Sequence, residues 1–249
     1  MPLPLVPLPI VPLTTAPLPL ILLPGSLCNQ LLFQPQIDFF KGHREVIVAN
    51  FSNCDSIEAM AAKVLNEAPA EFALAGLSMG GIVAFEMFRQ APQRIVRIAF
   101  LDTNPRGELP ENVPVRHQQI NDIAQGSVET LKTFVSQQLM PKYAFDSEQR
   151  LKLEPLVMEM ALEVGADEFI NQWRALASRA DSWSTLKDIH CPALILCGVH
   201  DALCNEKLHR DMALELNHAR LDIIDEAGHL STLDAPEQVN KALESWLNS

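Results

Sequence analysis

The stretch G-L-S-M-G-G, from Gly76 to Gly81, joins an apolar run to a helical pattern. It contains the G-x-S-x-G spacing with which a sharp strand-to-helix turn holds a serine side chain in the open. In a chain of this composition the spacing arises by chance in about 2% of cases, so it needs support from the rest of the sequence. Ser78 is therefore a candidate nucleophile whose rival interpretation is a structural serine in a glycine-rich turn.

Apolar runs rich in β-forming residues recur on both sides of this turn. Helical patterns separate most of them, one starting at Asp55 as the expected N-cap and one, at 82–91, ending before Pro92. A last helix is expected to open with Asp234 as its cap and to run to about Asn248. The alternation predicts an α/β fold with a mostly parallel, doubly wound sheet of about six to eight strands. The expected strands are 19–23, 45–50, 71–77, 95–102, 193–199 and 219–225.

Residues 104–187 interrupt this alternation. They carry four helical patterns, at about 113–125, 127–140, 147–164 and 167–179, with no clear strand between them. Since the strand pattern resumes afterwards, the block is interpreted as an all-helical cap inserted into the sheet domain. The predicted organisation is a Pro-rich extended segment at 1–17, a core at 18–103 and 188–249, and the cap at 104–187.

Three chemically reactive residues follow predicted strands. Ser78 follows the third strand, Asp201 the fifth and His229 the sixth. Carboxyl ends of parallel strands meet at one edge of a sheet, so these side chains are expected to converge there. Histidine can take the proton of a serine hydroxyl, and a carboxylate behind it holds the ring in the required tautomer.

Of these three residues the carboxylate, Asp201, is the least certain, because Asp102 and Asp225 also lie near strand ends. His200 directly precedes Asp201 and is disfavoured as the base. The remaining histidines lack a strand-end context and are expected on the surface or in loops: His43, His117, His190, His209 and His218.

An oxyanion hole would need two backbone N–H donors. Met79 follows the candidate nucleophile at the start of a helix, where the helix dipole favours negative charge. The second donor is expected in the loop after the first strand, from Ser26 or otherwise Leu27. Gly76 and Gly80 are expected because the turn leaves no room for Cβ atoms and because glycine tolerates unusual backbone angles.

Composition excludes several classes of protein. The net charge of −12 and the absence of Lys/Arg clusters argue against nucleic acid or an anionic membrane as a partner. Seven prolines within the first 19 residues exclude a helical signal sequence or membrane span there. Five cysteines without a C-x-x-C pair argue against a structural metal site and favour a cytoplasmic setting. No metal and no organic cofactor is expected.

Several motifs together resemble the α/β-hydrolase superfamily, in particular its small bacterial esterase-like members with a helical cap. They are LLPGSLCN, GLSMGG, LDTNPR, PALILCGVHD and EAGHLSTLDAPEQV, so the likeness runs from about Leu20 to the C-terminus. The resemblance implies that Ser78 is the nucleophile, Asp201 the acid and His229 the base. Two departures stand out: Pro24 precedes Gly25 where many members have His-Gly, and a Pro-rich stretch replaces the usual first β-hairpin.

The predicted function is hydrolysis of a small-molecule carboxylic ester of small to medium acyl chain through an acyl-enzyme on Ser78. Alternatives with the same residues are a lactonase, a thioesterase, or a lyase of the menaquinone-pathway kind. That lyase would use arginines of the cap to bind an anionic substrate. A further alternative is a non-catalytic ligand-binding protein with the same fold. The sequence leaves the natural substrate and the oligomeric state open. Cap arginines that bear on the lyase are Arg106, Arg116, Arg150, Arg174 and Arg179; candidate pocket residues are Phe134, Leu139, Met140 and Trp173.

Overall fold

A computed structural model describes residues 17–216 and 218–249 of the chain. The Pro-rich segment predicted over residues 1–17 lies outside the described residues except for its last one. Within the described ranges, no helix combines the length and the apolar character needed to cross a bilayer.

The described residues form a six-stranded parallel sheet in the order β2-β1-β3-β4-β5-β6. This confirms the predicted doubly wound α/β fold, with strand ends within three residues of expectation. The central strands β1, β3 and β5 are buried along their whole length, which explains their continuous apolar sequences. The strands are β1 (Leu20–Leu23), β2 (Val46–Val48), β3 (Phe72–Leu77), β4 (Ile95–Leu101), β5 (Ala193–Gly198) and β6 (Ala219–Ile224).

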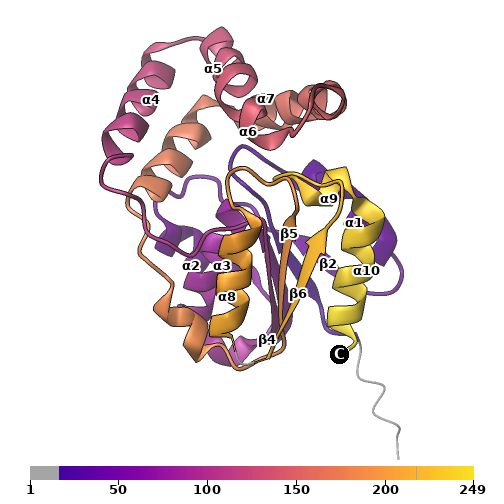
Figure 1. Ribbon diagram of the computed structural model, residues 1–249. Helices are drawn as coiled ribbons and strands as arrows, with labels where there is room; N and C mark the ends of the chain where they lie inside the picture. Colours follow the sequence, from indigo (N-terminus) through magenta and orange to yellow (C-terminus); the bar gives the residue numbers. More distant parts are fainter. Residues whose placement is uncertain (1–16, 217) are drawn as a thin grey trace, which may run out of the picture.

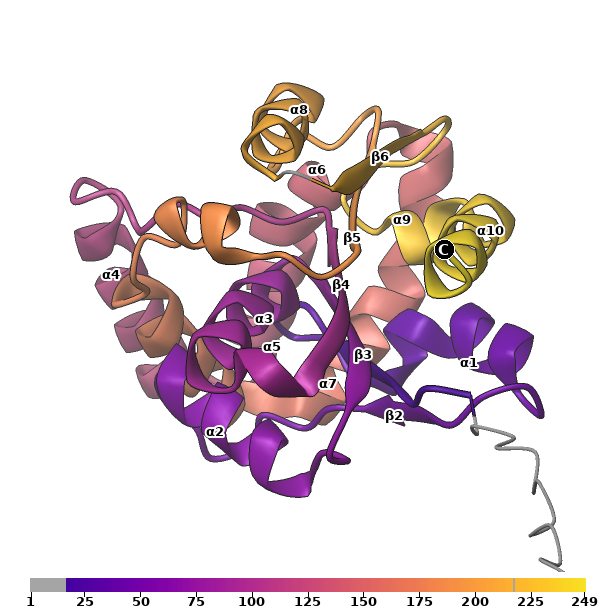
Figure 2. The same ribbon diagram turned by 90° about the horizontal axis from the view of Figure 1, so that it is seen from below.

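Helices cover both faces of the sheet (Figures 1 and 2). One face carries α2 (Ile57–Glu67), α3 (Met79–Gln90) and α8 (Glu206–Glu215); the other carries α1 (Gln34–Phe40) and α10 (Pro236–Leu247). Short 3-10 helices occupy Gln30–Phe33, Pro92–Arg94 and Ser184–Asp188.

Two predicted helix starts differ from the structure. Ser56, not Asp55, caps α2, since its side chain accepts a hydrogen bond from the Ala59 N–H at 3.1 Å. Asp234 does not cap the last helix: it ends a short helix α9 (Ser231–Asp234), and Ala235 precedes α10. Its carboxylate instead accepts a hydrogen bond from the Gly228 N–H, at 2.8 Å. The Gly228 N–H thus binds the carboxylate oxygen with which Asp234 could have capped a helix.

Between β4 and β5 the chain forms helices that lie over one edge of the sheet, where Figure 1 shows them above the strands. They are called the cap helices here: α4 (Val113–Gln125), α5 (Val128–Phe134), α6 (Met140–Tyr143) and α7 (Ser147–Ala177), with a π-helical turn at Val135–Leu139. Gly165, at φ 83° and ψ 175°, breaks α7 into two helical halves. A residue with a side chain would be strained in that conformation.

Candidate active site

The turn between β3 and α3 holds Ser78 at φ 55° and ψ −116°, a strained conformation for a residue with a side chain. The neighbouring glycines are needed for space. A Cβ on Gly80 would lie 2.0 Å from the backbone oxygen of Leu23, and one on Gly76 would lie 2.3 Å from the Gly80 oxygen. Neither glycine has a positive φ, so the prediction that they supply unusual backbone angles was wrong. The left-handed conformation falls on Ser78 itself.

Ser78, His229 and Asp201 form a continuous hydrogen-bonded chain. The Nε2 atom of His229 lies 2.9 Å from the Ser78 hydroxyl oxygen, and its Nδ1 atom lies 2.9 Å from Asp201 Oδ2. His229 is 1% exposed and Asp201 4%. The second oxygen of Asp201 accepts hydrogen bonds from the backbone N–H groups of Leu203 and Cys204, at 2.8 and 2.9 Å. The carboxylate is therefore held on one side by the backbone while its other side faces the ring.

The two rival carboxylates lie elsewhere. Asp102 is fully buried and accepts hydrogen bonds from the Gly198 N–H, at 2.8 Å, and from the Ser231 hydroxyl. Burial, and then the negative charge of Asp201, raise the pKa of Asp102 well above its ordinary value. Asp225 is exposed. Of the three candidates, only Asp201 contacts the imidazole in the structure.

His209 was wrongly expected on the surface or in a loop. It lies in α8 with no exposed surface, and its Nε2 atom accepts a hydrogen bond from the Thr103 N–H at 3.1 Å. Burial lowers the pKa of this imidazole, which keeps the ring neutral and able to accept. Its spacing of three residues from the buried Met212 was a helical signal that could have placed it on the inner face.

Two backbone N–H groups beside Ser78 have no hydrogen-bond acceptor in the part of the chain that the structure describes. They belong to Ser26, in the loop after β1, and to Met79, the first residue of α3. Leu27, the alternative donor, is already occupied: its N–H donates to the Gln172 side-chain oxygen at 2.8 Å. Because β1 and β3 are neighbours in the sheet, both loops reach the same edge.

Ser78 and His229 open into a cavity of about 340 Å³ roofed by the cap helices. Of the four apolar residues expected in a pocket, Phe134, Leu139 and Trp173 line it, whereas Met140 is buried away from it. The ring of Tyr143 stacks on the His229 ring with centroids 5.3 Å apart. Sequence reasoning missed Tyr143, because nothing in its local pattern distinguishes a lining tyrosine from a packed one.

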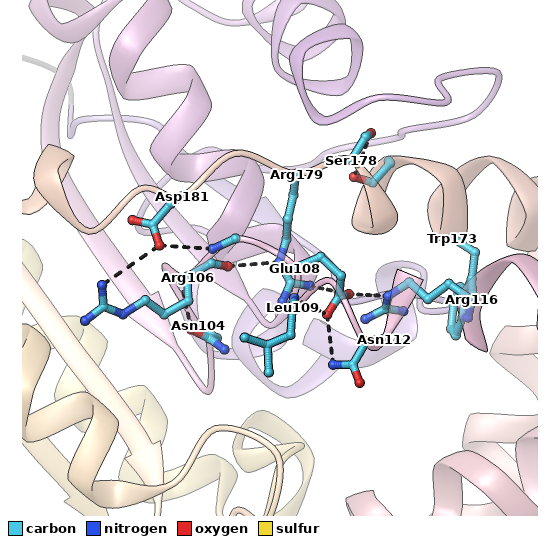
Figure 3. Close-up of polar contacts among 12 residues, drawn as sticks. Asn104, Arg106, Glu108, Leu109, Asn112, Arg116, Trp173, Ser178, Arg179 and Asp181 are labelled. Atoms are coloured by element: carbon cyan, nitrogen blue, oxygen red, sulfur yellow. Dashed lines mark hydrogen bonds and ion pairs between the residues drawn. The ribbon is translucent and has the colours of Figure 1, made fainter. Parts of the chain in front are cut away.

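One wall of the cavity is charged. Glu108, Arg116 and Arg179 meet there, with both guanidinium groups against the same carboxylate (Figure 3). Burial alone would raise the pKa of Glu108, but Arg179 and Arg116 outweigh it and lower that pKa. The two guanidinium groups thus favour the ionised form of Glu108, whereas burial lowers the pKa of Arg179.

The side chains beside Ser78 suit proton transfer better than metal binding. Asp201, Cys204 and His229 bring potential ligand atoms within 4.8 Å of one another. Both ring nitrogens of His229 are engaged, however, with Asp201 and Ser78. Burial also raises the pKa of Cys204 well above its ordinary value, and the thiol form is a poor metal ligand.

Comparison with known proteins finds similar chains that are named as hydrolases or esterases. A hydrolase of Acinetobacter baylyi that acts on (E)-2-((N-methylformamido)methylene)succinate is 27% identical, covering 93% of this chain and 90% of its own. A pimeloyl-[acyl-carrier protein] methyl ester esterase of Aromatoleum aromaticum is 27% identical over 76% of this chain and 79% of its own. A thermophilic esterase of Thermogutta terrifontis, solved with malate bound, superposes with a TM-score of 0.84 at 25% identity, covering 93% and 89% of the two chains.

These relatives are hydrolases, and the sequence model of a whole family agrees with them. That model, described as the alpha/beta hydrolase fold, matches residues 19–236, which include every strand of the sheet and all three residues of the hydrogen-bonded chain. The protein therefore belongs to the alpha/beta hydrolase fold family.

Proposed function

We propose that this hydrolase cleaves carboxylic esters of small to medium acyl chain, with Ser78 as nucleophile, His229 as general base and Asp201 as its carboxylate partner. The observation that carries the proposal is the pair of 2.9 Å contacts that link these three side chains at the floor of the cavity. A serine hydroxyl is too weakly acidic to attack an ester unaided and requires a base in such contact. The esterase names of two relatives support the same reaction class.

In the proposed reaction, Ser78 Oγ attacks the ester carbonyl carbon while His229 Nε2 takes the hydroxyl proton. The carbonyl oxygen becomes negatively charged and accepts hydrogen bonds from the Ser26 and Met79 N–H groups. Collapse of the intermediate expels the alcohol, which leaves with the proton from Nε2. A water molecule then attacks the acyl-enzyme, giving its proton to Nε2, and the carboxylic acid is released with Ser78 restored.

The neighbouring groups support these roles. Asp201 stabilises the imidazolium that forms in each half-reaction, and its backbone hydrogen bonds keep the carboxylate aimed at Nδ1. Tyr143 covers one face of the His229 ring and excludes water from it. Within residues 17–216 and 218–249 the N–H groups of Ser26 and Met79 have no acceptor, so both can donate to an oxyanion.

The decisive experiment is intact-protein mass spectrometry during turnover of short-chain esters, with Ser78→Ala alongside. We expect an acyl adduct on Ser78 and a loss of kcat of about 10⁴- to 10⁶-fold in the variant. Ser245→Ala, at an exposed serine of α10 that does not line the cavity, is the matched control and should retain full activity. More than a tenth of the wild-type rate in Ser78→Ala would refute the assignment of the nucleophile.

A further inference from the structure

The cavity carries a net positive charge, although the protein as a whole is negatively charged. The ionisable side chains lining the cavity, His229 and the thiol and phenol groups aside, are Glu108, Arg116, Lys142 and Arg179. Three cations against one carboxylate leave a formal charge of +2, whereas the whole chain carries −12. An excess of positive charge in a cavity of an acidic protein attracts and orients anions.

The two arginines are fixed rather than solvated. The Nε atom of Arg116 donates to Glu108 Oε2, and Nη1 of Arg179 lies 3.4 Å from the same oxygen. Nε of Arg179 donates to the Arg106 backbone oxygen at 3.0 Å (Figure 3). Their side chains are only 20% and 10% exposed, so both guanidinium groups are held in place before any ligand binds.

Glu108 does not use up the hydrogen-bonding capacity of these arginines. In the described part of the chain, three guanidinium nitrogens have no hydrogen-bond acceptor. They are Nη1 and Nη2 of Arg116 and Nη2 of Arg179. None of these nitrogens is among the buried, unsatisfied polar atoms of the described residues, so they are accessible to whatever occupies the cavity. A planar anion entering the cavity would accept from these donors, and a carboxylate matches the fork of a guanidinium best.

The alternative, that these arginines only fasten α4 to the loop that follows β4, accounts for the contacts with Glu108. It does not account for the excess of positive charge on this wall, or for both side chains facing the cavity that contains Ser78 and His229. The other cap arginines are different: Arg106 stacks on Trp183, Arg150 pairs with Glu154, and Arg174 is exposed.

We infer that the ester hydrolysed at Ser78 carries a carboxylate, which Arg116 and Arg179 bind at the charged wall of the cavity while Glu108 holds the two guanidinium groups in position. This rests on the proposed function and narrows it to monoanionic esters. Arg116 and Arg179 are binding residues in this scheme, and Glu108 is a positioning residue.

The test compares esters that differ only in the carboxylate. Monomethyl adipate is paired with methyl hexanoate, and 4-acetoxybutanoate with butyl acetate, so that a methyl group replaces the carboxylate on the acyl side or on the alcohol side. Monomethyl esters from malonate to pimelate then report the distance between the arginines and the reacting carbon. We expect kcat/KM for at least one anionic ester to exceed that of its neutral partner by about 10-fold or more.

Variants separate binding from folding. Arg116→Gln and Arg179→Gln should each lower kcat/KM for the preferred anionic ester by about 10- to 100-fold, with little change for the neutral partner. Arg179→Lys keeps the charge but loses the fork, and should recover part of the loss. Arg174→Gln, at an exposed arginine that does not line the cavity, is the control and should behave as wild type. Thermal unfolding of each variant identifies any that fail to fold.

The outcomes are distinct. Neutral esters hydrolysed as fast as both anionic ones by the wild-type protein would overturn the carboxylate inference and leave the serine hydrolase intact. If no ester is hydrolysed, the proposed function fails, and calorimetry with adipate and succinate decides the anion site by itself. Saturable binding that is lost in Arg179→Gln and kept in Arg174→Gln would support the site. Absence of binding to the wild-type protein would overturn it.

Discussion

The side-chain oxygen of Gln172 accepts a 2.8 Å hydrogen bond from the backbone N–H of Leu27. Gln172 lies in the cap helix α7 and is 4% exposed, whereas Leu27 belongs to the loop after β1 and has a positive φ of 56°. A cap residue thus fixes the backbone of the loop that presents the Ser26 N–H. The cap helices consequently help to shape the proposed oxyanion hole as well as roof the cavity.

Gln172→Leu should reduce catalysis more than its position in a helix suggests. The substitution leaves the buried Leu27 N–H without an acceptor, which costs about 1–3 kcal/mol. The loop can recover a partner by rotating, and this displaces the Ser26 N–H from the oxyanion. We expect kcat to fall by about 10-fold or more, since loss of one such donor costs about 10²- to 10³-fold.

Steady-state kinetics and urea unfolding check this prediction together. Gln90→Leu, which removes a partly exposed glutamine on the far side of the sheet domain, is the control. A Gln172 variant with reduced stability but unchanged kcat would contradict a role for the contact in catalysis.

Asp201→Asn should lower kcat far more than Asp102→Asn. Asparagine at 201 no longer stabilises the imidazolium and favours the wrong ring tautomer, so kcat should fall by about 10⁴-fold. Asp102 contacts Ser231 and Gly198 instead, and burial raises its pKa, so an uncharged amide of the same shape is a close substitute. Its variant should stay within about 10-fold of wild type, the range of one neutral hydrogen bond. Equal losses in the two variants would contradict the assignment of Asp201.

The sequence predicted what depends on local pattern. All six strands were found from their apolar runs, which are continuous in β1, β3 and β5 because a buried parallel strand needs no polar residue on either face. The turn at Ser78 was found from its G-x-S-x-G spacing. The order of Ser78, Asp201 and His229 at strand ends indicated that they would meet. Strand-end position did not distinguish Asp201 from Asp102, since both follow central strands and only the loop geometry separates them.

Features that depend on distant contacts could not be predicted. The Gln172–Leu27 bond joins residues 145 positions apart, and the contacts of Arg179 with Glu108 and the Arg106 oxygen join ends of the cap insertion. Asp234 illustrates the same limit at short range: its sequence is typical of a helix cap, yet its carboxylate binds the Gly228 N–H. In each case the local sequence is compatible with several partners for the polar side chain, and the partner it has depends on how the folded chain packs.

Gly80→Ala should disrupt the turn at Ser78 by a steric route. The added Cβ would meet the Leu23 backbone oxygen at 2.0 Å, so α3 would have to move away from β1 and carry the Met79 N–H with it. We expect a loss of about 1–3 kcal/mol or more in the free energy of unfolding, together with a large fall in kcat.

Gly42→Ala is the comparison for Gly80→Ala. Its Cβ would meet nothing within 4 Å, but its φ of +81° makes alanine strained there. It should cost about 1–2 kcal/mol of stability without a change in kcat. If Gly80→Ala retained wild-type kcat, the close approach of α3 to β1 would not be what positions Ser78 for catalysis.

Asp234 should make the protein less stable as the pH rises. Burial raises the pKa of its carboxyl from 3.8 to about 6, although the hydrogen bond from the Gly228 N–H lowers it in part. Between these two pH values the folded state binds more protons than the unfolded chain, so the free energy of unfolding falls with increasing pH. The contribution is fully present below about pH 4 and is lost as the pH passes about 6, at most about 3 kcal/mol in all.

Asp234→Asn removes this titration and keeps an oxygen that can accept from Gly228. Its free energy of unfolding, measured by urea denaturation from pH 4 to pH 8, should decline less steeply than that of the wild-type protein. The variant should be the more stable of the two above pH 6, where the wild-type carboxyl is buried as a charge. Asp225→Asn, at an exposed neighbour, should leave the wild-type profile unchanged. A variant that is less stable than wild type above pH 6 but not at pH 4 would show that the Asp234 charge stabilises the loop carrying His229.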